Sequence, residues 1–190
     1  MDNLKINVEK CDFPFRGFKE YNRTFLGFTE PYKVVFVNEI DDILSFEGEF
    51  AQNFLDFYKN DIKKISLEKI SPPLSKGSCV FIEDHPNIIH AVTNQHGEAT
   101  DFKTLCYVVK NSLLLAESNC INIVYMPLIG SFNGQMDKDG CAFTILEQLQ
   151  DIFFNAEFKY LHEIILVAKN DKEYEIINKY YDKLFGGNKK

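Results

Sequence analysis

The residues of this chain that most favour a chemical role form the run Met-Pro-Leu-Ile-Gly-Ser-Phe-Asn-Gly at positions 126–134. The run follows an apolar segment and precedes a segment with helical spacing. Its two glycines, Gly130 and Gly134, place no Cβ in the way, so backbone N–H groups can turn inward around a phosphate. An ordinary turn between a strand and a helix is the alternative for this run taken alone.

Three further side chains are candidates for acid or base chemistry. Asp41 follows an apolar run, and Asp137 follows the glycine-containing run. His96 lies in a polar segment, where an imidazole could titrate near neutral pH, although a solvated loop histidine is the simpler interpretation. His90 alternates with apolar neighbours, and we expect it to be a core or edge histidine with its hydrogen bonds satisfied.

The cysteines form no metal-binding pattern. They are odd in number, with no CxxC pair and no histidine at metal-ligand spacing, and they stand at Cys11, Cys79, Cys106, Cys120 and Cys141. The sequence therefore predicts no metal site, and it predicts no bound cofactor. The first eight residues contain no apolar leader, which favours a reducing, cytoplasmic location.

The elements that must position these groups alternate along the chain. Short apolar runs predict strands at 4–8, 33–37, 78–82, 87–92, 121–126 and 162–168. Apolar residues at helical spacing predict helices at 48–64, 101–118, 142–154 and 172–185. Thr100 or Asp101 is the expected N-cap of the second helix. This alternation is typical of an α/β protein, and we expect a three-layer α/β/α sandwich with a mixed, mainly parallel sheet.

Composition limits the partners of the chain. With 190 residues and no visible repeat or linker, we expect one domain spanning 1–190. The net charge of −7 disfavours non-specific binding to nucleic acid or to an anionic membrane. Only two arginines, Arg16 and Arg23, are present, so guanidinium clamps on phosphate are few. A phosphate would therefore depend on backbone amides and helix N-termini.

Several motifs together resemble those of a known family. Residues 126–130 match a Met-Pro-x-Ile-Gly run, Val92-Thr93 occupies the place of an Ile-Thr pair that ends a strand, and Phe102 stands where an aromatic begins the next helix. In these features the chain resembles a macrodomain, the ADP-ribose-binding fold. It is most similar to the branch that includes the terminal ADP-ribose protein glycohydrolase.

Two other segments match the macrodomain pattern in part. The Gly-Asp that follows the first strand in the family is Cys11-Asp12 here. The family's first loop reads Asn-x-x-Asn-x-x-Leu followed by several glycines. Here Asn38, Leu44, Gly48 and Ala51 fit that pattern, whereas Asp41 replaces the second Asn and most of the glycines are absent.

The resemblance implies a role for each matching position. Asp12 would accept from the adenine amino group, Thr93 and Phe102 would line the adenosine side, and Asn38 and Asp41 would lie near the distal ribose. Gly48 would belong to the first phosphate loop. The second loop would cradle the diphosphate with Gly130, Ser131, Phe132, Asn133 and Gly134.

The same resemblance puts catalysis in doubt. The glycohydrolase branch is expected to use a Lys directly after the Ile-Thr pair and an Asp just past the second loop. Asn94 and Gly134 stand at those positions. Glu47 and Glu49 occupy places where glycine amides would approach the diphosphate. Both halves of the expected mechanism are therefore missing.

Three functional hypotheses follow. The first is a binding module for ADP-ribose or a related adenine-ribose-phosphate ligand. It would read ADP-ribosylated macromolecules or sequester a nucleotide signal, a role that some phage proteins play. The second is an ADP-ribosyl or phosphomonoester hydrolase with Asp41, His96 or Asp137 as base. The third is a protein-interaction scaffold with a vestigial nucleotide pocket, whose contact surface would be the aromatic-rich insertion at 13–30.

Overall fold

The computed structural model describes residues 4–10, 32–46, 52, 55–56, 61–84, 87–95, 98–132 and 135–186. The predicted insertion at 13–30 lies outside these residues. The strands are β1 (Lys5–Lys10), β2 (Val34–Asp41), β3 (Cys79–Ile82), β4 (Asn87–Asn94), β5 (Ile123–Pro127) and β6 (Glu163–Ala168). The helices are α2 (Asp61–Lys69), α3 (Phe102–Ser118), α4 (Lys138–Asn155) and α5 (Asp171–Phe185).

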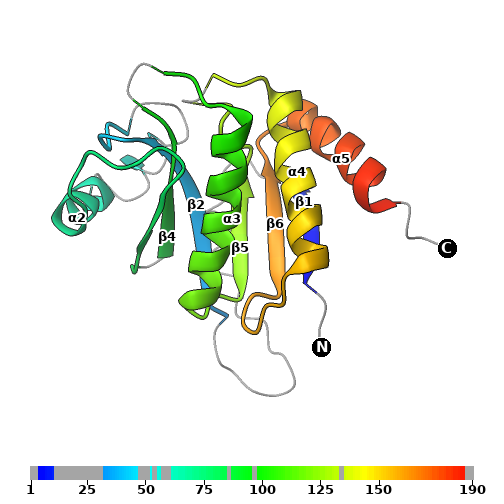
Figure 1. Ribbon diagram of the computed structural model, residues 1–190, viewed down its shortest axis with the longest axis horizontal. Coiled ribbons are helices and arrows are strands. Elements are labelled where there is room, and N and C mark those ends of the chain that lie inside the picture. The colour runs from blue at the N-terminus through cyan, green and yellow to red at the C-terminus, as the bar shows by residue number, and fades with distance from the viewer. Residues whose placement is uncertain are drawn as a thin grey trace.

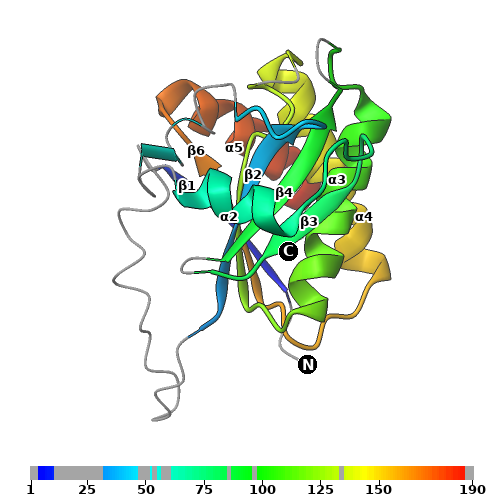
Figure 2. The same cartoon turned by 90° about the vertical axis from the view of Figure 1, so that its left-hand side faces the viewer.

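The six strands form one sheet in the order β1-β6-β5-β2-β4-β3 (Figures 1 and 2). Every neighbouring pair is parallel except β3 and β4, which are antiparallel. This confirms the expected mixed, mainly parallel sheet. Its central strand β2 is buried along its whole length, as its near-continuous apolar run predicts.

The helices cover the sheet on both faces, so the predicted three-layer sandwich is confirmed. Helices α3, α4 and α5 pack on one face, and α2 lies across the other (Figures 1 and 2). The pleat of the strands divides the core accordingly. Val37 and Ala91 belong to the hydrophobic cluster that contains Leu105 of α3. Phe36 and Val92 belong to the cluster on the other face, which contains Ile62 of α2.

Side-chain caps define where three helices begin. The Asp101 carboxylate accepts from Thr104 N at 2.7 Å, and it also pairs with Lys76 Nζ at 3.1 Å. The N-cap of α3 is therefore Asp101 rather than Thr100. The backbone hydrogen bond from Thr104 is the main cause that lowers the pKa of Asp101. Asp137 caps α4 and Asn170 caps α5 in the same way.

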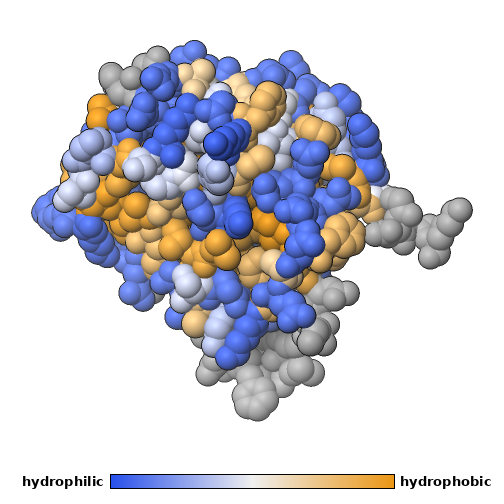
Figure 3. Space-filling view, in the orientation of Figure 1, coloured by the Kyte–Doolittle hydropathy of each residue, from blue (hydrophilic) through white to orange (hydrophobic). Residues whose placement is uncertain are grey.

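None of the helices in the described part of the chain is long and apolar enough to span a membrane. On the face covered by α3 and α4, hydrophilic residues are intermixed with hydrophobic ones (Figure 3). The exposed apolar side chains of α3 include Phe102, Tyr107 and Leu114.

Replacing Asp101 with alanine should lower the free energy of unfolding by about 1 kcal/mol, because Thr104 N loses its acceptor. The Asp101→Asn variant keeps an acceptor oxygen and should lose less. Chemical denaturation of the wild type and both variants measures the difference. Equal stability of the alanine variant and the wild type would contradict the assignment of this cap.

Candidate functional site

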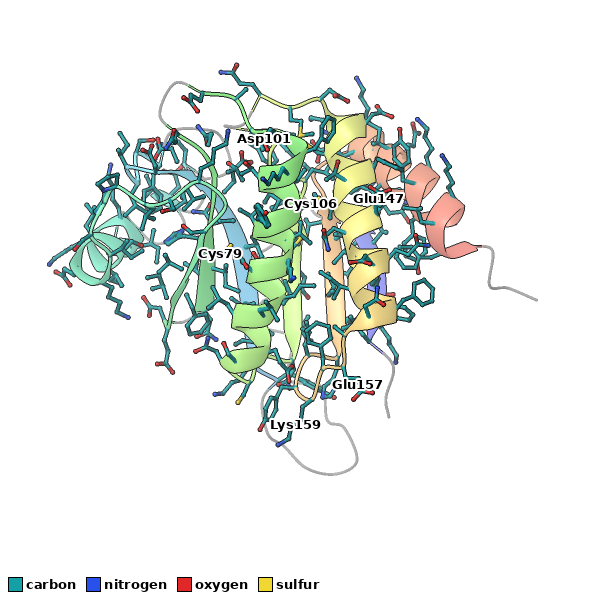
Figure 4. The ribbon with its side chains drawn as sticks, in the orientation of Figure 1. Cys79, Asp101, Cys106, Glu147, Glu157 and Lys159 are labelled. Atoms are coloured by element: carbon teal, nitrogen blue, oxygen red, sulfur yellow. The ribbon has the colours of Figure 1, made fainter. Side chains whose placement is uncertain are left out.

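The candidate site lies at the edge of the sheet where β2, β4 and β5 end and where α3 and α4 begin (Figure 1). Figure 4 marks this edge by Asp101, whereas Glu157 and Lys159 lie at the opposite edge. Eight of the predicted site residues belong to the described part of this edge: Asn38, Asp41, Thr93, Phe102, Gly130, Ser131, Phe132 and Asp137. Asp12, Gly48, His96, Asn133 and Gly134 lie outside the described residues.

Asn38 faces the α2 side of the sheet, in a buried chain of polar groups. Its Nδ2 lies 3.1 Å from His90 Nδ1, and His90 Nε2 lies 2.8 Å from Ser66 Oγ on α2. The Oδ1 atom of Asn38 is buried without a hydrogen-bond partner. Burial lowers the pKa of His90 to about 3, so this ring is neutral at physiological pH. Of the two positions expected for this histidine, core or edge, the structure shows the core.

Glu39 faces the other side of the sheet, and the sequence motifs did not single it out. Its side chain is only 1% exposed. One carboxylate oxygen accepts from Thr93 Oγ1 at 2.9 Å. The other accepts from Gly130 N at 3.0 Å and from Phe132 N at 3.4 Å. A charged residue inside the apolar run that precedes Asp41 was the signal that could have revealed it.

Thr93 reaches Glu39 because β4 carries a bulge. Ile40 pairs with Val92 and Asp41 pairs with Asn94, so Thr93 is an extra residue on β4. Bulges of this kind redirect a side chain and are frequent beside functional sites. The Thr93 hydroxyl also lies 3.1 Å from Asn94 Oδ1. The backbone carbonyl of Thr93 accepts from Thr100 Oγ1 at 2.9 Å. The bulge therefore connects β2, β4 and the segment that leads into α3.

The 127–132 loop passes over the N-terminal turn of α4. Gly130 has a φ of +90°, and a Cβ there would lie 3.4 Å from Cys141 Sγ and 3.5 Å from Leu105 Cδ1. Those distances are ordinary contacts, so it is the backbone conformation, with its positive φ, that favours a glycine here. Ser131 N donates to Leu128 O at 3.3 Å. Together with the contacts to Glu39, this gives all three N–H groups at 130–132 an acceptor within the chain.

The Asp41 side chain stabilises the loop that follows β2. Its carboxylate accepts from Ser45 N at 2.8 Å and from Ser45 Oγ. The loop that these bonds close includes Leu44, and Phe46 follows it directly; their φ angles of 56° and 55° lie in the left-handed region. Lys63 of α2 donates to Ser45 O at 3.2 Å and lies 6.0 Å from the centre of the Phe46 ring. The Asp41 carboxylate thus stabilises a strained turn.

The other candidate groups also have structural partners. Asp137 accepts from Gly140 N at 2.8 Å as the N-cap of α4. Asn94 is buried beside Thr93. Burial raises the pKa of the Cys141 thiol to about 12, and the negative charges of Glu39 and Asp137 act in the same direction. This thiol stays protonated at neutral pH and is a poor nucleophile, although it lies in the first turn of a helix.

Within the described part of the chain, no group of three or more His, Cys, Asp or Glu side chains could hold a metal ion. The described site therefore consists of a bulged strand end, two loops and the beginnings of two helices. Backbone N–H groups and buried carboxylates dominate its chemistry.

Comparison with known structures identifies the fold. A variant of the Oceanobacillus iheyensis macrodomain solved with ADPR matches 97% of this chain and 95% of its own, at 16% identity and a TM-score of 0.67. The macro domain of ganglioside induced differentiation associated protein 2 matches 95% of this chain and 84% of its own, at 15% identity and a TM-score of 0.71. The Trypanosoma brucei macrodomain solved in complex with ADP matches 93% of this chain and 68% of its own, at 10% identity and a TM-score of 0.67.

The chain therefore has the macrodomain fold, and the resemblance seen in the sequence motifs is confirmed at that level. No model of a known protein family matches the sequence, and a search of curated proteins also finds no match. Sequence identities of 10–16% to the structural neighbours fit a divergent chain.

The neutral state of His90 in the fold predicts a pH dependence of stability. Because the pKa is about 3 in the folded protein and near 6.5 in an unfolded chain, the unfolded state binds the proton first as pH falls. Above about pH 6.5 His90 is neutral in both states and does not lower the free energy of unfolding. Below that pH the free energy of unfolding falls, by about 1 kcal/mol between pH 6 and pH 5. Urea denaturation of wild type and His90→Gln at these pH values measures the loss, which the variant should lack. Parallel pH profiles would contradict the assignment.

Proposed function

We propose that this protein is a binding module for ADP-ribose or a related adenine-ribose-phosphate ligand. The observation that carries the proposal is the likeness of nearly the whole chain to a macrodomain solved with ADPR. The likeness to a macrodomain solved with ADP supports the same ligand class. The predicted site residues in the described part of the chain gather at the edge of the sheet where α/β folds bind ligands.

In this proposal Phe102 lines the adenosine side of the ligand. Phe102 is the first residue of α3 and is 59% exposed, so its ring is available for stacking. Thr93, in the bulge of β4, supports the segment that leads to this ring through the hydrogen bond from Thr100. Asp12 would recognise the adenine amino group, and the loops after β2 and β5 would face the rest of the ligand.

The described carboxylates support binding rather than hydrolysis. A general base needs a carboxylate that can reach the substrate or its attacking water. Asp41 is buried and held by Ser45, whereas Asp137 is exposed and uses one oxygen to accept from Gly140 N. At the position where the related hydrolases are expected to use a Lys, Asn94 is buried beside Thr93. We therefore propose a reader of ADP-ribosylated macromolecules or a protein that sequesters a free nucleotide.

Binding of ADP-ribose should produce saturable heat in isothermal titration calorimetry at ligand concentrations up to about 1 mM. Replacing Phe102 with alanine should weaken the affinity at least fivefold, because stacking of a base on an aromatic ring contributes about 1–3 kcal/mol. Phe154→Ala is the matched control, since Phe154 is 63% exposed near the C-terminal end of α4, at the opposite edge of the sheet.

Two results would count against the binding proposal. Absence of heat at millimolar ADP-ribose would end it and leave the scaffold hypothesis with the 13–30 segment as its contact surface. Equal losses in Phe102→Ala and Phe154→Ala would remove Phe102 from the site.

Incubation with an ADP-ribosylated protein should give binding without release of ADP-ribose, because Asp41 and Asp137 are engaged by the backbone. Chromatography of the supernatant measures release. Release that disappears in Asp41→Asn, while binding persists, would instead establish the hydrolase. The asparagine keeps an acceptor for Ser45 N, so the turn after β2 should survive the change.

A further inference from the structure

The Glu39 carboxylate occupies a position that a ligand phosphate would be expected to use. Gly130 N at 3.0 Å and Phe132 N at 3.4 Å converge on one of its oxygens. Converging backbone N–H groups of a glycine-containing loop are a common way of holding an anionic oxygen. In this protein the chain itself supplies the anion.

Glu39 cannot leave this position easily. It extends from a strand that is buried along its whole length, and its second oxygen accepts from Thr93 at the bulge of β4. On the loop side of the contact, Gly130 lies beside Cys141 of α4 and Leu105 of α3. The contact between Glu39 and the loop is therefore built into the folded state.

A ligand phosphate placed at the same N–H groups would meet this carboxylate. Two negative groups at hydrogen-bonding distance from shared donors repel each other, and the repulsion is strong where water is excluded. A neutral group, or a hydroxyl that donates to the carboxylate, has no such penalty. The charge of Glu39 thus affects which ligands can bind at this loop, in addition to the stability of the fold.

We infer that Glu39 is a specificity-determining residue, which fills the phosphate-binding amides of the 127–132 loop with an internal anion. The inference rests on the proposed function and sharpens it. Among adenine-ribose compounds, the site selects those that place little negative charge at this loop. Added phosphates therefore bring no gain in affinity.

The test is isothermal titration of the wild type and of Glu39→Gln with adenosine, AMP and ADP-ribose. Glutamine has the same shape, retains an acceptor for Gly130 N and removes the charge. We expect wild type to bind ADP-ribose no more than threefold more tightly than adenosine. In Glu39→Gln, affinity for ADP-ribose should rise at least tenfold, while affinity for adenosine stays within threefold.

Glu117→Gln is the matched control. The Glu117 carboxylate also accepts from loop N–H groups, those of Lys159, Tyr160 and Leu161, at 2.8–3.2 Å. It lies near the C-terminal end of α3, and Figure 4 shows Lys159 at the edge of the sheet opposite Asp101. The same chemical change at this place should leave all three affinities unchanged. Thermal unfolding of each variant establishes that it is folded.

Each outcome bears on the inference. An unchanged or weaker affinity of Glu39→Gln for ADP-ribose would overturn it, and so would equal gains for adenosine and ADP-ribose. If Glu39→Gln does not fold, the wild type still decides, because a preference for ADP-ribose over adenosine of tenfold or more would overturn the inference. Failure of every variant to bind any of the three compounds would instead overturn the proposed function.

Discussion

The complete burial of β2 is the constraint on which the rest of the site depends. A buried amide or carboxylate without a partner costs about 2 kcal/mol or more, so polar residues on such a strand must find hydrogen bonds inside the protein. The end of β2 carries three of them, Asn38, Glu39 and Asp41. Their direct partners include groups from β4 and from the loops after β2 and β5.

Each of the three residues joins a different part of the molecule to the central strand. Asn38 connects to His90 and through it to Ser66 on α2. Glu39 connects to the bulge of β4 and to the loop after β5. Asp41 closes the turn that follows β2. The edge of the sheet is thus held by a few buried polar contacts, and its chemistry is set by the groups that make them.

The negative net charge of the chain bears on phosphate recognition at this edge of the sheet. With a net charge of −7 and two arginines in the whole sequence, phosphate recognition depends on backbone N–H groups. In the described loop after β5, two of those groups already donate to Glu39. A carboxylate about 4 Å from a phosphate repels it by about 4 kcal/mol at an effective dielectric constant of about 20. Acidity at the site therefore favours a ligand with a smaller charge.

The sequence by itself determined the strands, the helices and the order in which they alternate, because apolar periodicity is a local property of the chain. It also determined that Gly130 lies in a loop between β5 and α4, where a residue without a Cβ is needed. The helix expected at 48–64 was less accurate, since α2 extends to Lys69. The apolar neighbours of His90 left a core or an edge position open, and the structure shows the core.

Only the tertiary structure decided which polar groups meet. The pleat sends Asn38 and Glu39 to opposite faces, and the bulge at Thr93 shifts the register of β4 by one residue. Neither the bulge nor the contact between Glu39 and the loop after β5 is visible in a local pattern, because both depend on segments more than fifty residues apart. The sequence thus predicted a phosphate cradle, and the tertiary structure placed a carboxylate within it.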